Sequence, residues 1–315
     1  MKRQTVITLA AGDTVEDLFA LTEKNLAQKR NGDPYLTVTL TDKTGRIKGV
    51  VWDDAQRIAA ETGTGEVVAV SGTVSEYRDA LQLTIRDMRK VPQDSVDPSD
   101  FLPVSGRDMD RMFERLKGMT ERMPAPHWRA LFKAFWEDET LVKGFCAAPA
   151  AKKMHHAYVG GLLEHTLSMA LLAQKIASHY KGIDQELLLA GVILHDIGKI
   201  RELTAQVAID YSDEGRLVSH IVLGLEMLAE KLQLVKDFPV DQALLLKHLI
   251  VSHHGSRAFG SPEPPKTVEA VLLNYIDEID AKVQGIREFI AREPADGGSW
   301  TSFHRLLERH FYKGT

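Results

Sequence analysis

The feature that most constrains this chain is an apolar run that ends in two adjacent ionisable residues. Residues 187–199 read Leu-Leu-Leu-Ala-Gly-Val-Ile-Leu-His-Asp-Ile-Gly-Lys. The apolar part is long enough to form a core helix, so His195 and Asp196 fall on its last turn, and Gly198 is expected to let the chain leave the helix. An imidazole and a carboxylate buried in this way are costly unless something pairs with them. Because a single His-Asp pair is a weak motif, the other histidines decide its meaning.

The other candidate ligands follow similar apolar segments. The sequence Gly-Gly-Leu-Leu-Glu-His carries His165 and opens a predicted helix over residues 162–179. The remaining candidates lie on or after further amphipathic segments, and they are His220, His253, His254 and Asp277, with Asp280 close behind. Helices in a bundle can bring such residues into one cavity. Any one histidine fits an ordinary core or surface position, but the ordered set predicts a metal site.

This order of ligands resembles that of the HD-domain metal-dependent phosphohydrolases, over residues 150–290. The residues that match the four that name that family are His165, His195, Asp196 and Asp277. The residues that match the additional histidines of its two-metal members are His220 and either His253 or His254. The resemblance implies an all-α bundle that hydrolyses a phosphoester.

Imidazole and carboxylate ligands favour transition metals over calcium. We expect a divalent cofactor with two ions per site, Mn²⁺ being the first choice and Co²⁺, Fe²⁺, Ni²⁺, Zn²⁺ or Mg²⁺ the alternatives. Asp196 lies between two sets of histidines, so it is the natural bridge between the ions. The first ion would bind His165, His195, Asp196 and Asp277, and the second would bind Asp196, His220 and either His253 or His254.

Two further residues are predicted to contact the substrate. Lys199 lies just beyond the His-Asp pair and can neutralise charge on a phosphate, so it forms the predicted catalytic pair with Asp196. The alternative for Lys199 is a lysine favoured by the dipole at a helix end. Before the first ligand helix lie four residues that could meet substrate phosphates, namely Lys152, Lys153, His155 and His156, and the resemblance to the HD family favours His156. The alternative for His156 is a position in a solvated loop.

Residues 1–92 are predicted to be mostly β-strand. Leu36, Val38 and Leu40 alternate with polar residues, as one face of a half-buried strand requires. The predicted strands cover residues 6–10, 35–40, 47–52, 66–77 and 81–88, with a helix over residues 53–62. This number and order of elements predict a small closed all-β barrel of the OB type.

Residues 35–52 also resemble the strand-turn-strand core of nucleic-acid-binding OB folds. Such folds bind single strands with exposed aromatic side chains and a few cations. The candidate substrate-binding aromatics are Tyr35 and Trp52, with Tyr77, Arg46, Lys48 and Arg78 nearby. The alternative is that Tyr35 and Trp52 fill the barrel or its mouth. Since the net charge is −5, any nucleic-acid contact would be a local groove and not a broadly basic surface.

Residues 93–149 are predicted to form a proline-containing linker and connector helices over residues 108–123 and 127–145. Packing in the core is expected for Trp128, Phe132, Phe135 and Trp136. Residues 150–315 form the predicted HD domain, which ends in a helix over residues 300–312 that packs on the domain or contacts a second subunit of a homo-oligomer. The expected fold is therefore multi-domain, a small all-β OB-type barrel followed by an all-α HD-domain helical bundle.

The compartment is predicted from what the sequence lacks. Cys146 is the single cysteine, which excludes an intramolecular disulfide and is typical of a reducing cytoplasm. No apolar run approaches the roughly 18 residues that a membrane-spanning helix needs. We therefore expect a cytoplasmic protein without a membrane partner.

A barrel of this kind followed by an HD domain resembles the bacterial YhaM-type 3′→5′ exoribonucleases across nearly the full chain. The matching stretches are residues 35–52, 155–166 and 195–199. The resemblance implies removal of nucleoside monophosphates from the 3′ end of single-stranded RNA, with single-stranded DNA as an alternative substrate and the barrel holding the strand. Other functions stay open, namely an HD-domain phosphohydrolase of small nucleotides, an RNA-binding protein with weak nuclease activity and, more remotely, a di-iron oxygenase.

Overall fold

The chain divides into two compact units, each described here by itself. The computed structural model describes residues 3–29, 31–77, 80–92, 95–152, 154–205, 207–293 and 298–314. The first unit comprises Met1–Val104 and Thr204–Asp210, and the second comprises Ser105–Leu203 and Tyr211–Thr315. The boundary thus lies beyond the predicted residue 92, and the connector helices belong to the second unit. Arg78 and Lys153, candidate cations above, lie outside the described residues.

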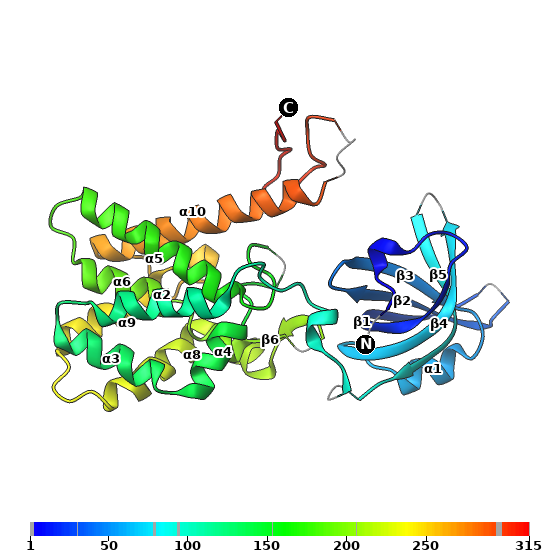
Figure 1. The fold of residues 1–315 in the computed structure, drawn as a ribbon, viewed down its shortest axis with the longest axis horizontal. Coiled ribbons are helices and arrows are strands. Elements are labelled where there is room, and N and C mark those ends of the chain that lie inside the picture. The colour runs from blue at the N-terminus through cyan, green and yellow to red at the C-terminus, as the bar shows by residue number, and fades with distance from the viewer. Residues whose placement is uncertain are drawn as a thin grey trace. The chain divides into compact units, whose positions relative to one another are not determined.

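The first unit contains a closed barrel of five strands, drawn in blue to cyan in Figure 1. Its elements are β1 (Thr14–Gln28), β2 (Pro34–Asp42), β3 (Gly45–Val51), α1 (Ala55–Glu61), β4 (Glu66–Tyr77) and β5 (Ala80–Lys90). β1 pairs antiparallel with β2 and β4, whereas β3 pairs antiparallel with β2 and parallel with β5. The predicted OB-type barrel, with its helix between the third and fourth strands, is confirmed.

Alternation along β2 builds the interior of the barrel. Leu36, Val38 and Leu40 are buried there, as the period of two predicts. The turn into β3 is closed by Asp42, whose Oδ1 accepts hydrogen bonds from the backbone N–H groups of Thr44 and Gly45 at 2.8 and 3.2 Å. A short polar side chain that bonds the backbone two residues on is a standard way to form such a turn.

The strand predicted over residues 6–10 is wrong. Val6–Thr8 form a single 3₁₀ turn, and the first strand is β1. The consecutive residues Phe19, Ala20 and Leu21 are all buried, and the register with β2 shifts just after Leu21. A bulge of this kind breaks the period of two, so β1 lacks the alternation that identified the other strands. Ala20 also packs outside the barrel interior, in a cluster with Phe101 and Val207.

The second unit is a bundle of helices around one apolar core, drawn in green to orange in Figure 1. Its helices are α2 (Met109–Glu121), α3 (Pro126–Trp136), α4 (Glu139–Ala147), α5 (Gly161–His179), α6 (Gln185–Leu194), α7 (Lys199–Glu202), α8 (Asp213–Gln233), α9 (Val240–Ser252) and α10 (Val268–Ala291). Between α7 and α8 run two short paired strands, β6 (Leu203–Ala205) and β7 (Ile209–Tyr211). Within the described ranges, no helix has the length and apolar character needed to cross a bilayer.

The predicted connector helix over residues 127–145 is two helices. Trp128, Phe132 and Phe135 are buried as predicted, and Trp136 packs against the same core. The break comes at Asp138, whose carboxylate accepts a hydrogen bond from the backbone N–H of Leu141 and begins α4. This N-cap satisfies a donor that a new helix would otherwise leave open.

The helix predicted over residues 300–312 is also wrong. The described residues there form isolated bridges between Trp300 and Tyr312 and between His304 and Arg309. Trp300, Phe303 and Leu306 are more than half exposed, whereas Phe311 is half-buried against Phe289 of α10, so only part of the predicted apolar face packs on the bundle. A short helix is marginal without such packing, and here the backbone pairs across a turn instead.

Candidate metal centre

Two buried polar residues of the second unit, His195 and Asp196, directly follow helix α6. Asp184 caps its first turn by accepting a hydrogen bond from the Leu187 N–H at 3.0 Å. Every residue from position 187 to 194 is buried. His195 and Asp196 therefore follow directly from a buried helix and are themselves 0% and 2% exposed.

Gly198 has a different role from the one predicted. Its φ of −65° is ordinary right-handed backbone, so it does not end the helix through a left-handed turn. A Cβ at this position would lie 2.0 Å from the carbonyl oxygen of His220. Glycine thus allows α7 and α8 to approach closely, and this approach brings His220 to Asp196.

Four histidines have their Nε2 atoms in the region around Asp196, and they are His165, His195, His220 and His253. In two of them Nδ1 donates to a backbone carbonyl three residues earlier, at 2.8 Å to Val192 and 2.6 Å to Ile250. In the other two Nδ1 donates to a carboxylate, at 2.8 Å from His165 to Asp280 and 2.8 Å from His220 to Glu202. With Nδ1 protonated and anchored, a neutral ring presents the lone pair of Nε2.

The four Nε2 atoms are buried and have no hydrogen-bond partner within the part of the chain that the structure describes. The same is true of Oδ1 of Asp196. Buried polar atoms in proteins nearly always have a partner, so a cluster of five unpartnered acceptors implies a missing electrophile. Imidazole nitrogen and carboxylate oxygen are ligands that suit a divalent transition metal. The residues present therefore fit the metal that the sequence predicts.

Asp196 lies between two groups of ligand atoms. Its Oδ2 is 3.2 Å from Nε2 of His195, and its Oδ1 is 3.5 Å from Nε2 of His220 and 3.6 Å from Nε2 of His253. The first group of atoms within 4.8 Å of one another comes from His165, His195 and Asp277. The second comes from His220, His253 and His254. The two carboxylate oxygens thus face different groups, which is the arrangement expected of a bridging ligand.

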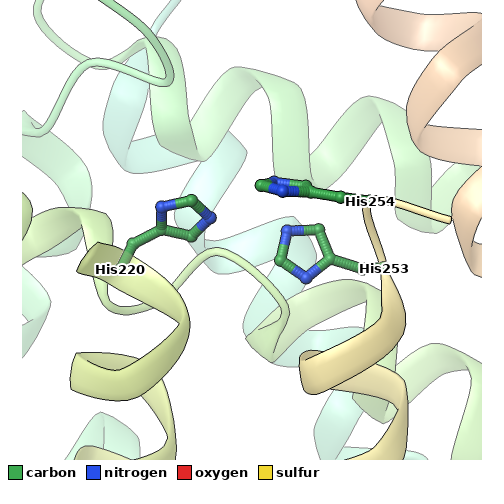
Figure 2. A group of neighbouring side chains, drawn as sticks. All are labelled: His220, His253 and His254. Carbon is green, nitrogen blue, oxygen red and sulfur yellow. The ribbon is translucent and has the colours of Figure 1, made fainter. Parts of the chain in front are cut away.

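Figure 2 shows how the second group is assembled. The ring of His220 extends from α8 toward the rings of His253 and His254, which follow the end of α9. The sequence left open which of the two adjacent histidines faces the site. Both do, and Nδ1 of His254 is buried without a partner among the described residues.

Neighbouring charges shift the pKa values of Asp196, Lys199 and His165. Burial alone would raise the pKa of Asp196, but the neighbouring His195 and the Lys199 ammonium outweigh it and hold that pKa well below its usual range. Nζ of Lys199 donates to Oδ2 of Asp196 at 2.6 Å, which offsets the effect of burial and raises the pKa of the lysine. Burial would lower the pKa of His165, but Asp277 and Asp280 raise it to about 9, so a metal ion that binds this ring would displace a proton.

His156 differs from the simple substrate contact that was predicted. It is 2% exposed, and both of its ring nitrogens have protein partners. Nδ1 lies 2.7 Å from the hydroxyl of Tyr158, and Nε2 lies 3.1 Å from Oδ2 of Asp280. Asp280 in turn bonds His165, so these contacts favour a role for His156 in positioning a ligand.

The site also includes Glu202, which was absent from the predictions, and His155, which was one of four candidate phosphate contacts. Glu202 accepts hydrogen bonds at 2.8 Å from both the backbone N–H and Nδ1 of His220. Glu202 thereby holds His220 in place. The residue before His220 is strained, since Ser219 has a φ of 65° and interrupts α8. The signal that could have found Glu202 is an acidic residue six positions beyond Asp196, in a buried or half-buried stretch. His155 lies beside His165, and burial lowers the pKa of His155 to about 3.

The predicted aromatics of the barrel form a stacked pair, in which Trp52 is exposed and Tyr35 is half-buried. The rings of Tyr35 and Trp52 stack with centroids 5.5 Å apart, and Trp52 is 44% exposed. Nζ of Lys29 lies 5.1 Å from the centre of the Trp52 ring. The pair therefore does not fill the barrel interior, and it presents an aromatic face and a cation on the first unit.

Comparison with known proteins matches both units. The HD domain family matches residues 162–282, a stretch that contains every predicted metal ligand. The OB-fold nucleic acid binding domain family matches residues 21–91, which include the aromatic pair. The metal-ligand geometry therefore lies in a domain of the HD family and the aromatic pair in a domain of a nucleic-acid-binding family.

Full-length relatives combine the same two domains in one chain. The protein named 3′-5′ exoribonuclease YhaM of Bacillus velezensis is 38% identical, over 96% of this chain and 96% of that protein. Its counterpart in Bacillus subtilis is 36% identical over 96% of each chain. The counterpart in Bacillus licheniformis is 35% identical, over 96% of this chain and 95% of that one. With this identity along almost its whole length, the chain belongs to the YhaM 3′-5′ exoribonuclease family.

Proposed function

We propose that this chain is a metal-dependent 3′-5′ exoribonuclease that releases nucleoside monophosphates from single-stranded RNA. The observation that carries the proposal is the cluster of buried, unpartnered ligand atoms around Asp196, in a chain whose relatives are named exoribonucleases. The aromatic pair of the barrel supports a single-stranded substrate, because stacking on an aromatic ring needs unpaired bases.

The proposed cofactor is a pair of divalent ions, with Mn²⁺ the first choice and Co²⁺ the second. The first ion would be held by His165, His195, Asp196 and Asp277, and the second by Asp196, His220, His253 and His254. Divalent ions supply Lewis acidity toward a phosphate and lower the pKa of a water. The chain's own part is to orient the ligands through their Nδ1 atoms and to hold Asp196 ionised between them.

The decisive experiment follows a 5′-labelled single-stranded RNA incubated with the metal-loaded protein. The proposal predicts shortening one nucleotide at a time, with release of nucleoside monophosphates, and loss of activity in a chelator. A DNA strand of the same sequence serves as the alternative substrate. Hydrolysis of small nucleotides with the RNA left intact would favour a small-nucleotide phosphohydrolase. Retention of RNA without turnover would favour an RNA-binding protein.

Lys199 is proposed to place its positive charge beside the reacting phosphate. Lys199→Ala should slow turnover by roughly 10- to 100-fold, the range expected for a hydrogen bond to a charged group. Metal content should stay at the wild-type level, because the Lys199 ammonium contacts Asp196 and is not itself a ligand. Steady-state kinetics with elemental analysis tests both points, with Lys247→Ala on the exposed face of α9 as control. Loss of metal or of folding would assign Lys199 a structural role.

Glu202 is proposed to set the position of His220. Glu202→Ala should weaken binding of the second ion by about 10- to 100-fold, as is typical when the partner of a ligating histidine is removed. Metal titration should then resolve one tight and one weakened site. Glu202→Gln, which keeps an acceptor for His220, should lose less, and Glu214→Ala at an exposed position is the control. Two sites of unchanged affinity in Glu202→Ala would contradict this role.

A further inference from the structure

The turn between α4 and α5 holds its two adjacent histidines differently. His156 adopts a left-handed backbone conformation with φ of 51°. Its carbonyl oxygen accepts hydrogen bonds from the N–H groups of Ala150 at 3.1 Å and Tyr158 at 2.9 Å. A Cβ on Gly161 would lie 2.0 Å from that same oxygen, so a glycine is required where α5 begins. The turn is therefore closed tightly around His156, whose ring is fully engaged inside the protein.

His155 points its ring to the proposed metal site. The centroid of its ring lies 5.3 Å from that of His165, a ligand of the first group. The predicted contact between a histidine of this turn and the substrate thus has a better candidate than His156.

One ring nitrogen of His155 lacks a partner. Nδ1 is buried and makes no hydrogen bond to any residue that the structure describes. Among those residues, His155 also belongs to none of the groups whose atoms converge closely enough to hold a metal ion. A buried polar atom beside a reaction site, with neither a protein partner nor a place among the ligands, is suited to bond the substrate.

We propose that His155, and not His156, contacts the substrate, with Nδ1–H donating to an oxygen of the scissile phosphate beside the ligands of the first ion. His156 is then a positioning residue, which holds Asp280 and through it the ring of His165. This inference rests on the proposed function, because it takes a phosphoester as the substrate.

The test measures binding of inorganic phosphate to the full-length, metal-loaded protein by calorimetry. His155→Ala should weaken phosphate binding about 10-fold or more, the usual loss for a hydrogen bond to a charged group, and should leave metal content unchanged. His155→Asn places an amide near the position of Nδ1 and should retain most of the affinity. His155→Gln, whose amide lies nearer the position of Nε2, should resemble His155→Ala. His179→Ala, on the exposed end of α5, is the matched control.

Kinetics give a second readout with a different expectation. The His155→Ala variant should lose the same factor in kcat/KM on bis(p-nitrophenyl) phosphate and on RNA, because both substrates carry the contacted phosphate. Unchanged phosphate affinity in a folded His155→Ala variant would overturn the contact. Loss of metal would make His155 a ligand, and equal losses in the Asn and Gln variants would exclude an Nδ1 hydrogen bond.

The failure of this inference is distinguishable from failure of the proposed function. If the wild-type protein binds phosphate through His155 but leaves RNA intact, the nuclease proposal fails and the contact stands. If the wild-type protein degrades RNA while His155→Ala binds phosphate and turns over normally, only the contact fails. Thermal unfolding of each variant shows that the comparison is made between folded proteins.

Discussion

Replacing Asp196 with alanine is expected to abolish RNA hydrolysis and to remove more metal than any other single change. Its two oxygens face the two ligand groups separately, so its loss affects both proposed ions. Bound metal ions contribute several kcal/mol to transition-state stabilisation, and each 1.4 kcal/mol or so is about tenfold in rate, so kcat should fall by at least roughly 10³-fold. Asp277→Ala should retain more metal, because Asp277 belongs to the first group alone.

Elemental analysis and single-turnover kinetics on both variants test this difference. Removing Asp196 also leaves the Lys199 ammonium without its carboxylate, which destabilises a buried group. Asp196→Asn keeps the volume of the side chain, and its thermal unfolding shows whether lost activity reflects lost folding. Asp213→Ala, at an exposed position of α8, is the control. Equal metal loss in Asp196→Ala and Asp277→Ala would be incompatible with a bridging role.

Removing both stacked aromatics of the barrel should weaken RNA binding without slowing hydrolysis of a small phosphodiester. Stacking of one base on an aromatic ring contributes about 1–3 kcal/mol, so Tyr35→Ala/Trp52→Ala should raise the Kd for single-stranded RNA by roughly 5- to 150-fold. The proposed metal ligands lie in the other compact unit, so activity on bis(p-nitrophenyl) phosphate should stay at the wild-type level. Point variants are preferable to a truncation, which would expose Val207 and remove its barrel partners.

The informative quantity is the ratio of the activity on RNA to the activity on bis(p-nitrophenyl) phosphate. Both are measured at one salt concentration, because phosphate contacts are sensitive to salt. Tyr180→Ala replaces a similarly exposed aromatic residue of the helical unit and should leave the ratio unchanged. Lys29→Ala should shift the ratio in the same direction as the aromatic variant, by less, because it removes only the cation beside Trp52. An unaltered ratio in the double variant would mean that the barrel does not hold the substrate, and a small-nucleotide phosphohydrolase would become the better explanation.

The sequence alone was sufficient to predict burial where a residue's neighbours along the chain determine its environment. The alternation of Leu36, Val38 and Leu40 places them inside the barrel because a strand turns alternate side chains to one face. The apolar run before His195 forces that residue into the core, since a buried helix carries its last turn with it. The stacked arrangement of Tyr35 and Trp52 needed the structure, although both residues were identified beforehand.

Tertiary contacts decided the remainder, because they join residues that are distant in the chain. The bulge in β1 depends on its pairing with β2. The residues near Trp300 form no helix because most of their apolar side chains stay exposed, although Phe311 packs on α10. Gly198 is needed for the approach of α8, not for its own backbone. The different surroundings of His155 and His156 depend on Asp280, more than a hundred residues away, whose carboxylate contacts the His156 ring, whereas Nδ1 of His155 has no partner among the described residues. No local pattern distinguishes two adjacent histidines, since only packing determines which ring faces inward.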